Sequence, residues 1–290
     1  MDEKTIVRLD TPGLTRQQKF LIGAKNILWA FSPLLLYLFL PGLCMSIGML
    51  IRGWNRSTDD FIRESGNFYT TAGIIIAFAI IFYRMKKRKE DFFQNTTLFL
   101  DHIDWLKAAW YAVLGLSLSV FLSSLITLFP VFRQLTSSYK NASELLFRGT
   151  DLLLIVLSLV VFAPVLEEIV FRGLMLNRLL TQFSERTSIL IVSAAFAMCH
   201  GNLLWILYTF FAGYILTKTA MREDNILYSI VIHMGFNFPS VLNIMIRHNE
   251  EAASLFFENP VLIAAYGILS LMVLIVWFRS DLTYKREENL

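Results

Sequence analysis

Long apolar runs divide this chain of 290 residues, and they limit its possible folds more than any other feature. The runs are about 20 residues long with short charged stretches between them, and a helix needs about that length to cross a hydrocarbon core about 30 Å thick. The composition agrees, because 56% of the residues are hydrophobic and only 17% are charged. We therefore predict an all-α, polytopic membrane protein, which excludes a soluble globular domain and a disordered chain.

Eight transmembrane helices can be predicted from the apolar runs. Their ranges are 27–51, 67–84, 105–129, 151–180, 188–201, 203–221, 225–246 and 260–278. A proline or a capping side chain lies at several limits: Pro130 after the third range, Asp151 and Asn225 at the start of the fourth and seventh, and Pro260 in the first turn of the eighth. The fourth range is longer than the hydrocarbon core requires, so we expect it to tilt or to extend into the cytoplasm.

The distribution of Lys and Arg predicts the orientation. More than twice as many of these residues lie in segments on the side of the N-terminus as on the other side. The positive-inside rule then predicts that both termini are cytoplasmic. The expected location is a plasma membrane of the bacterial type. The basic run 84–89 directly follows a predicted helix, which is typical of a topology signal, so no nucleic acid is expected as a partner.

The first polar cluster inside an apolar run contains two carboxylates and one guanidinium. Ionisable groups are costly in a membrane, so those that occur there are candidate functional groups. Glu168 and Arg172 are four residues apart and share a helix face, where they can pair and fix the position of the helix. Glu167 is turned about 100° away from that face. The spacing therefore makes Glu167 the candidate catalytic carboxylate.

Two further clusters follow on later runs. His200 comes one helical turn after Phe196, and His233 shares a face of the seventh range with Asn237. At a rise of 1.5 Å per residue, all three clusters lie roughly 12–20 Å from the cytoplasmic ends of their helices. We therefore expect the three clusters to meet in one layer of the membrane.

Such a set of side chains is suited to hydrolysis by water. Glu167 can act as a general base, and His200 can orient the water or transfer a proton. His233 and Asn237 can donate hydrogen bonds to the oxyanion that forms when water attacks a peptide carbonyl. Because no Ser or Cys nucleophile is evident in the clusters, the pattern favours water-mediated cleavage of a peptide bond.

The three clusters resemble the motifs of the CAAX-protease and bacteriocin-processing family of intramembrane proteases, also called CPBP or Abi. The motifs Glu-Glu-x-x-x-Arg, Phe-x-x-x-His and His-x-x-x-Asn occur in order on adjacent predicted helices. They stand here as Glu167-Glu168-x-x-x-Arg172, Phe196-x-x-x-His200 and His233-x-x-x-Asn237, and the resemblance covers about residues 150–245.

The resemblance implies an eight-helix fold around a polar cavity that opens toward the cytoplasm. It also implies a Glu-activated water that cleaves a membrane-associated, lipidated or leader-type peptide near the membrane surface. The first Glu would be the base, the histidines and Asn would position water and the oxyanion, and the second Glu and Arg would give structural support. The eukaryotic branch cleaves prenylated CaaX tails, and bacterial members are tied to peptide maturation and bacteriocin immunity.

Four segments make up the predicted membrane domain. A cytoplasmic N-terminal segment covers 1–26, and the first three transmembrane helices cover 27–149. The CPBP-like catalytic core covers 150–246, and the last transmembrane helix with a cytoplasmic tail covers 247–290.

A zinc-dependent mechanism is an alternative at the same site. Two His and two Glu could ligate zinc, but there is no His-Glu-x-x-His helix, and a Glu paired with Arg172 is a poor ligand. Cys44 and Cys199 show no zinc-ribbon spacing. A mechanism without a cofactor is therefore favoured, and zinc stays open.

Two other functions would also explain the polar clusters. A catalytically silent immunity or scaffold protein could keep the fold, with the same side chains joining helices by hydrogen bonds. A proton-coupled transporter could use buried Glu and His, but it is expected to show paired repeats with broken helices. The polar residues here lie in one stretch, which favours the protease.

Overall fold

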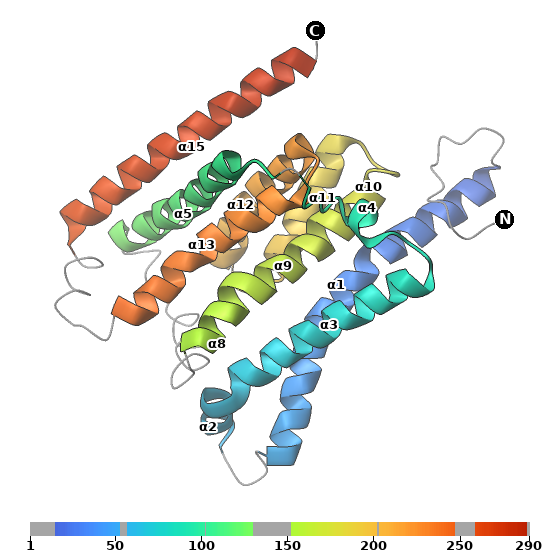
Figure 1. Cartoon of the computed structure of the whole chain (residues 1–290), viewed down its shortest axis with the longest axis horizontal. Coiled ribbons are helices and arrows are strands. Elements are labelled where there is room, and N and C mark those ends of the chain that lie inside the picture. The colour runs from blue at the N-terminus through green and yellow to red at the C-terminus, as the bar shows by residue number, and fades with distance from the viewer. Residues whose placement is uncertain are drawn as a thin grey trace. The chain divides into compact units, whose positions relative to one another are not determined.

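The computed structural model describes residues 15–52, 57–101, 103–129, 152–201, 203–246 and 259–288, and all regular structure within them is helical (Figure 1). The longer helices are α1 (Arg16–Arg52), α3 (Asn67–Lys87), α5 (Trp105–Leu128), α11 (Glu185–Met198), α12 (Leu203–Glu223), α13 (Ile226–Ile246) and α15 (Pro260–Glu288). Two short helices, α2 (Thr58–Phe61) and α4 (Phe92–Thr96), flank α3. The predicted all-α fold is confirmed.

Six described segments are long and apolar enough to cross a membrane. They are Arg16–Arg52, Glu64–Lys87, Trp105–Leu128, Leu152–Leu179, Ile226–Asn243 and Pro260–Thr283. They coincide with six predicted ranges, so the protein is a multi-pass membrane protein. Helices α11 and α12 stand where the other two were predicted, but α11 has 14 residues and is only about 21 Å long. The count of eight crossings therefore stays a prediction.

Two of the predicted helix limits are confirmed. The side-chain oxygen of Asn225 accepts a hydrogen bond from the Leu227 N–H at 2.9 Å, where α13 begins. Pro260 is the first residue of α15. Pro130 and Asp151 lie outside the described residues.

Helix α1 begins at Arg16, well before the predicted limit at residue 27. The reason is a capping box, in which the Thr15 hydroxyl accepts from the Gln18 N–H and the Gln18 side chain accepts from the Thr15 N–H. The helix thus extends into the segment that was predicted to be cytoplasmic. The extension carries Arg16, Lys19 and Lys25, so the apolar-run criterion does not include it.

The described helices form two compact units. In the first, which runs to residue 101 and continues over 152–230, α1 lies along α3 and α11 lies along α12. In the second, which holds 103–129 and the described residues after 230, α5 lies along α15. Gly115 of α5 meets the backbone of Ile232 on α13 so closely that a Cβ atom would overlap the Ile232 carbonyl. Small residues allow such close helix packing in membranes.

The segment Leu152–Leu179 is helical throughout but changes its hydrogen-bond pattern. It consists of α8 (Leu152–Val156), the π-helical turn η2 (Leu157–Phe162), α9 (Ala163–Glu168), the π-helical turn η3 (Ile169–Met175) and α10 (Leu176–Leu179). Pro164 has no N–H to continue the α-helical pattern from the preceding turn, which explains the position of η2. π-Helical turns frequently occur at functional sites, and the two flank the helix that carries Glu167 and Glu168.

Candidate active site

Glu168 and Arg172 form the predicted ion pair. Glu168 ends α9 and Arg172 lies in η3, and the Arg172 Nη1 is 2.7 Å from the Glu168 Oε1. Both side chains are completely buried. A buried charge is tolerated only with a close partner and further hydrogen bonds, so each of these groups depends on the other.

Arg172, in η3, also contacts α12 and α11, through two hydrogen bonds and a cation–π contact. Its Nε donates to the Thr217 hydroxyl at 3.3 Å, and its Nη2 donates to the Gly213 carbonyl at 3.2 Å, both on α12. Its guanidinium carbon lies 4.4 Å from the centre of the Phe196 ring on α11, which is within the range of a cation–π interaction. Arg172 therefore holds η3 in place against α11 and α12 within the first unit.

His200 is held by the same Phe196. The imidazole follows the last turn of α11, where its Nδ1 lies 2.8 Å from the Phe196 carbonyl oxygen. Its ring centre is 4.7 Å from that of Phe196. A carbonyl oxygen can only accept a hydrogen bond, so Nδ1 carries a proton, and Nε2 is the nitrogen that can accept one when the ring is neutral. Phe196 therefore connects the arginine of one motif with the histidine of the next.

Glu167 is oriented by a residue that lies far away in the sequence. Its side chain is 7% exposed, and its Oε1 accepts a hydrogen bond from the hydroxyl of Tyr37, a half-buried residue of α1. Sequence reasoning missed Tyr37. The available signal was a phenol within a long apolar run, because a buried tyrosine hydroxyl usually finds a partner; nothing in the sequence indicated which partner.

His233 and Asn237 belong to the second unit. Both lie on α13, four residues apart and so on one face, with His233 buried and Asn237 half-buried. Glu167, Glu168, Arg172 and His200 lie in the first unit, where contacts through Phe196 connect Arg172 with His200. Because the two units are described separately, the meeting of all three motifs in one layer stays a prediction.

The residues that could bind a metal are His, Cys, Asp and Glu side chains. Within the helices described above, no three His, Cys, Asp or Glu side chains gather as a metal site. The Glu168 carboxylate binds Arg172, and the His200 Nδ1 faces a carbonyl. The mechanism without a cofactor and the zinc alternative therefore both stay predictions.

Residues 144–239 match the model of a protein family described as type II CAAX prenyl endopeptidase, Rce1-like. No curated protein and no solved structure matches the chain. The matched range contains all three motifs, from Glu167 to Asn237. The match and the motifs therefore agree on one protease family.

Proposed function

We propose that this chain, a member of the CAAX/CPBP family through its Rce1-like segment 144–239, is an intramembrane endopeptidase. It hydrolyses a peptide bond of a membrane-associated substrate with a water molecule that Glu167 activates. The observation that carries this proposal is that two adjacent carboxylates have different partners. Glu168 is neutralised by Arg172, whereas Glu167 is oriented by the hydroxyl of Tyr37.

The proposed reaction needs only water and side chains of this chain. The Glu167 carboxylate takes a proton from water as the oxygen attacks the carbonyl carbon, and the His200 Nε2 orients that water. The motif pattern of the sequence is the basis for proposing His233 and Asn237 as donors to the oxyanion of the tetrahedral intermediate. The C–N bond then breaks, and the proton held by Glu167 passes to the leaving amine.

Tyr37 gives the carboxylate a defined orientation in this scheme. Because its hydroxyl occupies Oε1 of Glu167, the second oxygen, Oε2, is the proposed proton acceptor. Glu168 and Arg172 hold η3 against α11 and α12 and so fix the position of the base. The proposed orientation has both termini in the cytoplasm, with cleavage near that face of a plasma membrane.

The substrate class follows from the chemistry that the matched family acts on. We propose a lipidated or leader-type peptide, and the first probe is a fluorogenic peptide that ends in a CaaX sequence with an S-farnesyl cysteine. The same peptide without the farnesyl group tests whether prenylation is required. Comparison of membrane and secreted peptides between wild-type and Glu167→Ala cells would then identify natural substrates.

The deciding experiment compares Glu167→Gln with the wild-type full-length chain in lipid nanodiscs. The substitution keeps the size of the side chain but removes the base, and general-base catalysis contributes about 10²–10⁴-fold. We expect at least a hundredfold loss of cleavage with unchanged folding. Glu185→Gln is the matched control, because Glu185 is exposed at the first turn of α11, outside the site.

Full activity of Glu167→Gln would refute the role of Glu167 as the base. If the Glu167→Gln chain instead retains its cellular function while no cleavage is detected even with the wild type, the silent scaffold alternative is correct.

A further inference from the structure

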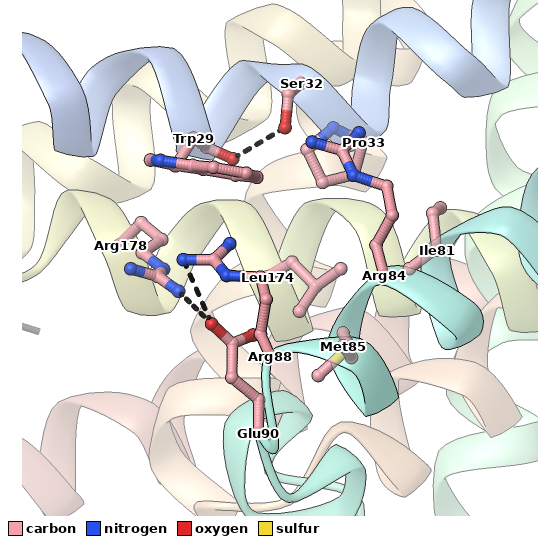
Figure 2. Close-up of a pocket in the computed structure, with 10 residues that line it drawn as sticks. All are labelled: Trp29, Ser32, Pro33, Ile81, Arg84, Met85, Arg88, Glu90, Leu174 and Arg178. Atoms are coloured by element: carbon pink, nitrogen blue, oxygen red, sulfur yellow. Dashed lines mark hydrogen bonds and ion pairs between the residues drawn. The ribbon is translucent and has the colours of Figure 1, made fainter. Parts of the chain in front are cut away.

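A hollow lined by basic residues lies in the first unit, apart from Glu167. It is bounded by Trp29 of α1, by Arg84 in the last turn of α3, by Arg88 and Glu90 in the following turn, and by Arg178 of α10 (Figure 2). Its volume is about 400 Å³, including space continuous with solvent. Segments far apart in sequence thus place three guanidinium groups around one space.

The lining of the hollow has an excess of positive charge. Glu90 is the one carboxylate among the residues that line it. Its Oε1 is shared, at 3.3 Å from Arg88 Nη2 and 3.3 Å from Arg178 Nη2. Among the described residues, Arg84 has no carboxylate partner. Two positive charges of the lining are therefore not neutralised by the protein groups that line it.

Trp29 holds two of these cations close together. The guanidinium carbons of Arg88 and Arg84 lie 3.9 Å and 5.0 Å from the centre of its ring. The indole face attracts each cation, but the two cations repel each other. An anion bound between them would remove this repulsion and use the fork of donors that each guanidinium presents.

The hollow lies at the boundary between membrane and water. Arg84 is in the final turn of the apolar segment Glu64–Lys87, which is long enough to cross a membrane. Trp is typical of this boundary, and the exposed side chains of Lys86 and Lys87 follow at the same level. Basic pockets between transmembrane helices at this level bind anionic lipid headgroups.

We propose that this hollow binds the phosphate group of an anionic phospholipid headgroup. Arg84 and Arg88 hold the phosphate oxygens over the Trp29 ring, and Glu90 competes with the phosphate for Arg88 and Arg178. A free phosphate ion has the same chemistry. The apolar residues Ile81 and Leu174 in the lining, and the apolar segments α1 and α3 that bound the hollow, favour the lipid, whose acyl chains need an apolar surface.

The test uses the full-length chain in mild detergent and native mass spectrometry to measure bound phosphatidylglycerol. We expect Arg84→Gln to weaken binding about tenfold, a conservative value for one lost charge-assisted contact. Lys86→Gln is the matched control, because it removes the same charge two residues away, outside the lining. It should change the affinity less than twofold.

Glu90→Gln is a second variant, and it should change the affinity for the lipid in the opposite direction. It removes the competing carboxylate, so phosphatidylglycerol should bind more tightly. Equal weakening by Arg84→Gln and Lys86→Gln would show attraction to general surface charge and would overturn the proposal. Displacement of the lipid by millimolar inorganic phosphate, or equal binding of phosphatidylcholine, would overturn the choice of an anionic lipid.

Discussion

Removing Arg172 alone is expected to destabilise the protein more than removing Arg172 together with its partner. Arg172→Met would leave the Glu168 carboxylate buried without its cation, which lies 2.7 Å away and shares complete burial. Breaking a buried pair in this way costs about 3–5 kcal/mol. The double variant Glu168→Gln, Arg172→Met removes both charges, so we expect it to recover about 2–3 kcal/mol of that loss.

The measured quantity is the free energy of unfolding in mixed detergent micelles, followed by circular dichroism. Arg178→Met is the matched control, because its pair with Glu90 is longer, at 3.3 Å, and partly exposed. Because water reaches this pair, its loss should cost less than breaking the completely buried pair. If Arg172→Met is no less stable than the double variant, the burial of the charge does not determine stability and the reasoning fails.

Three further predictions concern the base, the helix packing and the cofactor. Tyr37→Phe should lower kcat on the farnesylated peptide about tenfold with little change in KM, because it removes the donor that orients Glu167; an unchanged kcat would contradict that role. Gly115→Ala should lower the unfolding temperature, because its Cβ would overlap the Ile232 carbonyl, whereas Gly42→Ala, with no atom within 4 Å, should not. Cleavage should continue after treatment with a strong chelator; a loss that zinc restores would favour the zinc alternative.

The helices of the fold could be predicted where they depend on the length of an apolar run in the sequence. Each predicted apolar range overlaps a described helix, because a helix needs a minimum apolar length to cross the hydrocarbon core. The helix limits were less predictable where a helix continues into water. Thr15 and Gln18 extend α1 by a local capping box, which changes no hydrophobic run.

The site was predictable where it depends on neighbours along one helix. Glu168 with Arg172, and Phe196 with His200, are four residues apart, so helix geometry alone brings them together. The hydrogen bond from Tyr37 to Glu167 joins residues separated by 130 positions. Such a contact depends on how α1 packs against the rest of the unit, and no local pattern encodes that packing.

Pro33 has a consequence for how α1 responds to the membrane around it. It lies between Trp29 at the hollow and Tyr37 at the base, and it cannot donate to the Trp29 carbonyl, which accepts from the Ser32 hydroxyl at 3.4 Å instead (Figure 2). A proline within a helix permits bending. The part of α1 that precedes Pro33 can therefore tilt to follow bilayers of different thickness, while Tyr37, which follows Pro33, keeps its hydrogen bond to Glu167.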